Sequence, residues 1–134
     1  MTLQERIDAF FAGAPHAVVG ASHDRAKYGN KVFRAYLQND RDVYPVNPNT
    51  EKVESFETFP NLAALPQAVH GISVITKPDV TESVVEDAAE LGIQHIWMQP
   101  GAESGKAVER AEELGMNVIA GGPCVLVTLR YREG

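Results

Sequence analysis

The 134-residue sequence has little of several features that would tie it to a particular environment. It has one cysteine, Cys124, which excludes an intramolecular disulfide, and its 12 Lys and Arg are outnumbered by 18 Asp and Glu. The resulting net charge of −6 argues against the broad basic surface that nucleic-acid or anionic-membrane binding requires. No apolar run approaches the roughly 20 residues of a membrane-spanning helix, and no leader-like segment opens the chain. A cytoplasmic protein is therefore expected.

Catalytic and metal-binding patterns are also scarce. The histidines, His16, His23, His70 and His95, have no acid or hydroxyl residue at the spacing of a recognisable catalytic pair. No group of Cys, His and acidic residues has the spacing of metal ligands. We therefore expect no metal and no free-standing enzyme, and we assign the histidines to loops and strand flanks.

Apolar patterns along the chain predict strands that alternate with helices. Strands are expected at 17–20, 43–46, 72–75, 94–98 and 117–120, and helices at 29–38, 79–91 and 104–114. A capped helix within residues 1–13 precedes them and is expected to pack on the sheet. Such alternation predicts an α/β fold, a three-layer, doubly wound, Rossmann-like parallel sheet of about five strands, in one domain over residues 1–134.

Two other segments give weaker signals. The stretch from Asn47 to Pro66 is expected to be mostly irregular, with one helical turn near Leu62, and residues 125–129 form a short apolar tail. Pro45 places the second strand near an edge of the sheet. If the third strand packs on the other side of the first, strand order reverses between them, which is where such folds bind ligands.

An apolar run that ends in glycine, Ala17-Val18-Val19-Gly20-Ala21-Ser22, is typical of a strand followed by a phosphate-holding turn. A second glycine, Gly29, opens the next helix. A helix N-terminus offers unpaired N–H groups with partial positive charge, and glycine lets an anion approach them. With the other strand tips, the candidate binding residues are Gly20, Ala21, Ser22, Lys27, Tyr28, Gly29, Asn30, Lys31, Asn47, Pro48, Thr76, Lys77, Pro78, Gln99, Pro100 and Gly101.

The sequence argues against NAD as the ligand. The dinucleotide fingerprint Gly-x-Gly-x-x-Gly is absent, and Asn47 stands where NAD domains place an acid on the ribose hydroxyls. A phosphorylated ribose would instead favour nearby bases, for which the candidates are Arg25, Lys27, Lys31 and Lys52. Both NADP and coenzyme A carry such a phosphate, so charge alone leaves the two open.

Motifs at the strand tips also carry a family resemblance. They are the stretch 18–32, Tyr44-Pro45-Val46-Asn47-Pro48, Trp97-Met98-Gln99-Pro100-Gly101-Ala102 and Gly121-Gly122-Pro123-Cys124. Over about residues 14–127 the chain resembles the small stand-alone CoA-binding-domain proteins, similar in fold to the N-terminal domain of the succinyl-CoA synthetase α subunit. The resemblance implies coenzyme A as ligand, with its pyrophosphate at the glycine turn. The ligase's phosphorylated histidine belongs to a further domain that this sequence lacks, so no ligase activity is expected.

The leading hypothesis is thus a module that binds coenzyme A or an acyl-CoA as carrier, sensor or regulatory subunit, with a homodimer or partner protein possible. The alternative is an NADP-dependent oxidoreductase or other nucleotide-using enzyme, and a structural module with a decayed site is a third reading. Ser22 could simply cap its turn, and the lysines could form a solvated helix face. Cys124 is expected as a small buried side chain, or else as a thiol that exchanges with the coenzyme A thiol.

Overall fold

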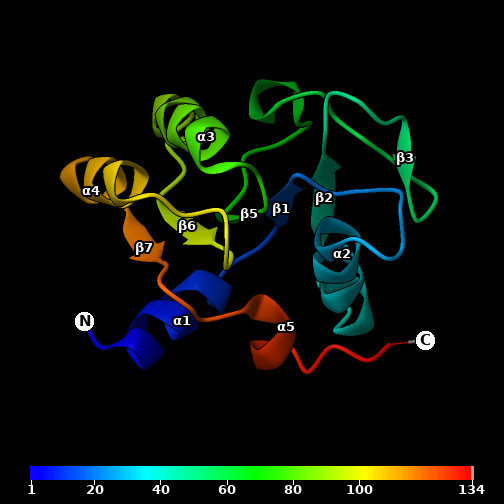
Figure 1. The fold of residues 1–134 in the computed structure, drawn as a ribbon, viewed down its shortest axis with the longest axis horizontal. Helices are drawn as coiled ribbons and strands as arrows, with labels where there is room; N and C mark the ends of the chain where they lie inside the picture. The colour runs from blue at the N-terminus through cyan, green and yellow to red at the C-terminus, as the bar shows by residue number, and fades with distance from the viewer. Residues whose placement is uncertain (134) are drawn as a thin grey trace.

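Five parallel strands form the central sheet of the protein in the order β2-β1-β5-β6-β7 (Figure 1). The computed structural model describes residues 1–133. The strands are β1 (His16–Val19), β2 (Val43–Val46), β5 (Gly71–Val74), β6 (His95–Met98) and β7 (Asn117–Ile119). The predicted α/β class and the edge position of the second strand are confirmed: β2 is an edge strand beside β1, and β5 lies on the other side of β1, which meets the condition for a reversal between them. Strand order therefore reverses between β1 and β5.

Helices cover both faces of this sheet (Figure 1). They are α1 (Leu3–Phe11), α2 (Tyr28–Gln38), α3 (Pro78–Glu90), α4 (Gly105–Glu113) and α5 (Val125–Thr128). Helices α3 and α4 lie on one face, and α1, α2 and α5 lie on the other (Figure 1). None of the helices within residues 1–133 is long and apolar enough to cross a membrane.

Alternating residues of the buried strands pack on opposite faces of the sheet and form two hydrophobic cores, one under each layer of helices. Ala17 and Val19 of β1 pack in the cluster that holds Val84 of α3, whereas Val18 packs with Phe33 of α2. All of β1 and β5 is buried, as expected for parallel strands covered on both faces. The layers thus hold the carboxyl ends of β1 and β5 rigidly beside each other.

The segment between β2 and β5 is more regular than the sequence predicted. It contains a hairpin of β3 (Lys52–Val53) and β4 (Phe56–Glu57), followed by the 3-10 helix η1 (Leu62–Ala64). The hairpin turns on Glu54 and Ser55, both with positive φ. Such turns usually use Asn or Gly, so the sequence carries no signal for this one. Most of residues 47–66 is irregular as expected, and the predicted helical turn near Leu62 is η1, but the hairpin was not predicted, and the apolar tail forms helix α5.

Helix α1 begins with the predicted capping box between Thr2 and Glu5. Its last turn is anchored by two histidines at the amino edge of the sheet: His16 Nε2 donates to Phe10 O over 2.7 Å, and His70 Nε2 donates to Ala9 O over 2.9 Å. His16, expected at a strand flank, is the first residue of β1 and is fully buried. The histidines therefore serve packing at the edge opposite to the carboxyl ends of the strands.

Candidate functional site

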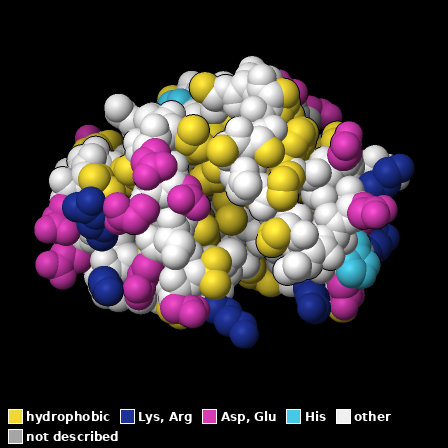
Figure 2. Space-filling view, turned by 90° about the horizontal axis from the view of Figure 1, so that it is seen from above, with side chains coloured by type: hydrophobic (Ala, Val, Ile, Leu, Met, Phe, Trp, Pro, Cys, Tyr) yellow, Lys and Arg dark blue, Asp and Glu magenta, His cyan; other side chains and the backbone are white. Residues whose placement is uncertain are grey.

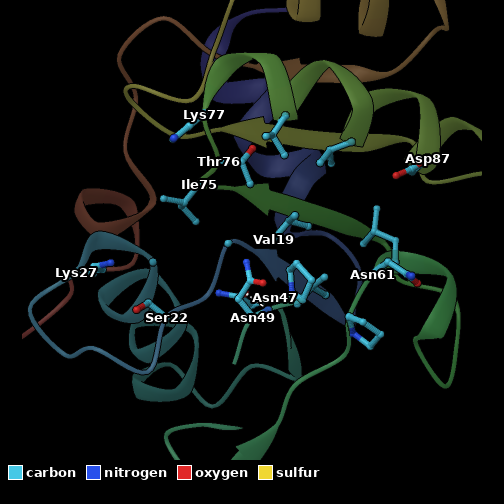
Figure 3. Close-up of a pocket in the computed structure, with 18 of the residues that line it drawn as sticks. Val19, Ser22, Lys27, Asn47, Asn49, Asn61, Ile75, Thr76, Lys77 and Asp87 are labelled. Carbon is cyan, nitrogen blue, oxygen red and sulfur yellow. Dashed lines mark hydrogen bonds between the residues drawn. The ribbon is translucent and has the colours of Figure 1, made fainter. Parts of the chain in front are cut away.

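A cavity of about 770 Å³ lies at the carboxyl ends of β1, β2 and β5, where strand order reverses (Figure 3). Figure 2 looks onto this edge and shows hydrophobic side chains gathered around a hollow. The predicted residues that line the cavity are Gly20, Ser22, Lys27, Tyr28, Gly29, Asn47, Pro48, Thr76 and Lys77. Those that do not line it are Ala21, Asn30, Lys31, Pro78, Gln99, Pro100 and Gly101.

The glycine turn after β1 requires both of its glycines. Gly20 has a φ of +97°, and a Cβ there would collide with the carbonyl oxygen of Ile75. A Cβ on Gly29 would in turn collide with the carbonyl oxygen of Gly20. Only residues without a side chain let the start of α2 pack against the tips of β1 and β5.

The first turn of α2 offers hydrogen-bond donors to the cavity. The Asn30 and Lys31 amides both donate to Lys27 O, over 3.1 and 3.2 Å. Within residues 1–133, the Tyr28 and Gly29 amides have no hydrogen-bond acceptor of the protein. Both residues line the cavity beside Lys27. Two free amides, the positive end of the helix and an ammonium group together suit an anionic group such as a phosphate.

Ser22 and Asn47 line the cavity and also hold its loops. Ser22 Oγ accepts from the Asp24 amide over 3.1 Å, which leaves its hydroxyl proton available. Asn47 Nδ2 donates to Ala21 O over 2.7 Å, and Asn47 Oδ1 accepts from the Asn49 amide over 2.8 Å. Asn47 therefore ties the tip of β2 to the glycine turn, where NAD domains would present a carboxylate to the ligand.

Asn30 supports the site from behind. Its side chain is fully buried, and Asn30 Nδ2 donates to Ser22 O over 2.9 Å and to Glu54 Oε2 over 3.1 Å. Asn30 Oδ1 accepts from Arg34 Nε over 2.7 Å. All polar atoms of this side chain are thus used inside the protein. The predicted ligand contact of Asn30 is corrected to a supporting role.

Gln99, at the tip of β6, is also buried and away from the cavity. Gln99 Oε1 accepts from Tyr28 Oη over 3.2 Å and from the Val125 amide over 3.0 Å. Tyr28 Oη in turn contacts Cys124 Sγ. Burial raises the pKa of the Tyr28 hydroxyl, so it stays protonated and donates to Gln99. Gln99 therefore contacts Tyr28, which lines the cavity, and does not line the cavity itself as was predicted.

Local structure explains why the remaining predicted residues lie outside the cavity. Lys31 Nζ lies 3.6 Å from Glu133 Oε2, and Ala21 is fully buried. Pro78 is the first residue of α3, where proline fits because that amide needs no helical acceptor. Pro100 and Gly101 are exposed in the loop after β6. Cys124 is half-buried behind Tyr28, and its thiol exchange stays a prediction.

The sequence did not predict most of the cavity wall that α3 and η1 form. The lining residues that it did not predict are Val19, Val46, Asn49, Pro60, Asn61, Leu62, Ile75, Val80, Val84 and Asp87. Positions 80, 84 and 87 share one side of α3, and this spacing is the one signal that could have placed them together. Lys27 and Lys77 lie at one end of the cavity, and Asn61 and Asp87 lie at the other (Figure 3).

Comparison with known proteins places this architecture in a family. The model of the family described as CoA binding domain matches residues 15–130. The α subunit of an ADP-forming acetate–CoA ligase II from Pyrococcus furiosus is 31% identical over 131 residues, which covers 89% of this chain but 28% of that subunit. The chain thus spans less than a third of the length of this curated relative.

Solved structures of small proteins match over most of their length. A hypothetical protein from Pyrococcus horikoshii has a TM-score of 0.87 and 28% identity, over 95% of this chain and 89% of that chain. A conserved hypothetical protein from Pyrococcus furiosus has a TM-score of 0.81 and 34% identity, over 87% of this chain and 99% of that chain. By its sequence match and its five-stranded parallel sheet, the chain belongs to the CoA-binding domain family.

Proposed function

We propose that the protein binds coenzyme A or an acyl-CoA in the cavity at the carboxyl edge of the sheet, as a carrier, sensor or regulatory module without ligase activity of its own. The observation that carries this proposal is the arrangement of two free amides of α2 beside Lys27 and the glycine turn. Membership of the CoA-binding domain family supports the choice of ligand class.

The pyrophosphate occupies the lysine end of the cavity in this proposal. There the Tyr28 and Gly29 amides donate to its oxygens, and Lys27 and Lys77 balance its charge. Among the bases named from the sequence, Arg25 already lies 3.4 Å from Glu54 and Lys31 lies 3.6 Å from Glu133. Neither Lys27 nor Lys52 has such an ion pair within residues 1–133, and of these two Lys27 lines this cavity, so it is the base best placed for a phosphate.

The base of the ligand occupies the apolar middle of the cavity. Val80 and Val84, which lie between Lys77 and Asp87 along α3, and Leu62 of η1 supply aliphatic walls of the cavity. Flat heteroaromatic rings bind well between such aliphatic walls, because both ring faces leave water. The cavity is thus anion-binding at one end and apolar in the middle, as an adenosine diphosphate moiety requires.

The chemistry of the lining supports a binding role. Among the described residues that line the cavity there is no histidine or cysteine, and the carboxylate present, Asp87, lies at the end away from the lysines. A general acid or base beside the phosphates would favour a nucleotide-using enzyme. The lysine end offers Ser22, Thr76 and amide groups, the Tyr28 hydroxyl donates to Gln99, and Lys27 and Lys77 are assigned to the phosphate charge in this proposal.

Titration calorimetry with coenzyme A, dephospho-coenzyme A, NADP and NAD tests the proposal. We expect coenzyme A to bind most tightly and the dephospho form more weakly. Tighter binding of NADP would favour the oxidoreductase alternative, and binding of none of the four would favour a decayed site. Either result would overturn the proposal.

A further inference from the structure

The end of the cavity away from the lysines carries a polar pair from two separate elements. Asn61 immediately precedes η1, and Asp87 lies on the side of α3 that also presents Val80 and Val84 to the cavity. Figure 3 draws the two side chains at the same end, opposite to Lys27. Both residues are exposed, so a ligand in the cavity can reach their polar atoms.

The hydrogen bonds of the protein define what Asn61 has left to offer. Asn61 Oδ1 accepts from the Ala64 amide over 3.0 Å and so caps η1. A backbone amide can only donate, which assigns this atom as the oxygen of the side chain. Asn61 Nδ2 then remains as a donor for the cavity.

Asp87 offers the complementary group. An ionised carboxylate only accepts hydrogen bonds, and no ion pair engages Asp87 within residues 1–133. The spacing of Val80, Val84 and Asp87 on one side of α3 sets the carboxylate beyond the two valines. A ring between the aliphatic walls would thus point its outer edge at one acceptor and one donor.

We propose that Asp87 and Asn61 together select the heterocyclic base of the ligand: the Asp87 carboxylate accepts from an exocyclic amine, and Asn61 Nδ2 donates to the adjacent ring nitrogen. Adenine has this edge, with an amine beside an acceptor nitrogen. This inference rests on the proposed function, because it needs the phosphates at the lysine end. It assigns two specificity residues that the sequence analysis did not find.

The test compares coenzyme A with 1,N6-etheno-coenzyme A, in which the amine and the adjacent nitrogen are tied into a third ring. Calorimetry is carried out on the wild type, Asp87→Ala, Asn61→Ala and Glu90→Ala. Glu90→Ala is the matched control, because it removes the same charge from the same helix and Glu90 does not line the cavity. It therefore reports any long-range effect of charge on an anionic ligand.

We expect the wild type and Glu90→Ala to bind coenzyme A about tenfold more tightly than the etheno form, since one charged hydrogen bond has that order of effect. Asp87→Ala should bind both forms equally, and Asn61→Ala should reduce the preference. An unchanged preference in Asp87→Ala, or no preference in the wild type, would overturn the inference while coenzyme A binding itself stands. No binding of coenzyme A by the wild type would instead remove the proposed function.

Discussion

Gly29 packs against the carbonyl oxygen of Gly20 so closely that a Cβ on Gly29 would collide with that oxygen. The start of α2 therefore depends on two glycines nine positions apart, and Tyr28 and Gly29, whose amides have no acceptor within residues 1–133, both line the cavity.

Gly29→Ala should disrupt this approach. Since backbone faces the new methyl group, α2 must shift, and we expect a loss of about 1–3 kcal/mol in stability together with at least tenfold weaker binding of coenzyme A. Urea denaturation and calorimetry measure the two effects. Gly105→Ala is the control, because a Cβ at that helical position meets open space. Equal behaviour of the two variants would contradict the packing described.

Lys27→Ala should weaken coenzyme A binding without affecting the fold. Lys27 lines the cavity, and its side chain makes no capping hydrogen bond to α2. We expect about three- to tenfold weaker binding, and a smaller effect at high salt because the interaction is screened. Lys31→Ala, which removes a charge paired with Glu133 outside the cavity, should change affinity less. Calorimetry at 0.05 and 0.5 M salt would decide, and a larger effect at Lys31 would contradict the assignment.

Asn30→Ala should destabilise the protein through the loop behind the site. The change leaves the buried Arg34 Nε and the Ser22 carbonyl oxygen without this partner. We expect a cost of about 2–3 kcal/mol, since unpaired buried polar groups retain their desolvation penalty. Gln38→Ala, which removes only exposed hydrogen bonds to the Arg132 backbone at the other end of α2, serves as the control in thermal and urea denaturation. A cost below that of the control would contradict the supporting role of Asn30.

Stability should fall below neutral pH because of His16. Burial, and to a lesser extent the charge of Arg41, lowers the pKa of His16 to about 4, and burial also lowers the pKa of His95. The unfolded chain therefore binds more protons than the folded one between about pH 6.5 and pH 4. The contribution of His16 to the free energy of unfolding is fully present above about pH 6.5. It is lost as the pH falls toward about 4, by about 3 kcal/mol in total.

Urea denaturation of His16→Gln and His23→Gln across this range isolates the effect of His16. His23 is exposed, so His23→Gln should follow the wild type. Carboxylates that titrate in the same range affect all three proteins alike, and the difference between curves reports His16. The free energies of unfolding of the wild type and His16→Gln should converge as the pH falls. Parallel curves would contradict the buried neutral imidazole.

Local patterns in the sequence predicted much of this fold. The apolar run of β1, the glycine turn and the helical spacing of α2 each depend on neighbours in the chain, and these elements were placed within one or two residues. The position of the site at the carboxyl edge of the sheet could also be predicted, because parallel strands bring their carboxyl ends to the same edge. Nine of the predicted binding residues consequently line one cavity.

The features that the sequence did not predict depend on packing between segments that are distant in the chain. Whether Gln99 faces a ligand or the interior is decided by Tyr28 and Val125, which are far from it in the chain. The hairpin turn at Glu54 lacks the usual turn residues and is held by a hydrogen bond from Asn30. Asp87 looks like any exposed acid of an amphipathic helix until η1 is seen to face it across the cavity.

Amide chemical shifts during titration with coenzyme A give the most direct test of the binding site. The largest perturbations are expected at Ser22, Tyr28 and Gly29, where the phosphates would accept hydrogen bonds, and at the neighbouring Gly20, whose amide donates to Val46 O, with little change at Gly115 at the opposite edge of the sheet. Perturbations confined to the amino edge, or no saturable change at the glycine turn, would contradict it.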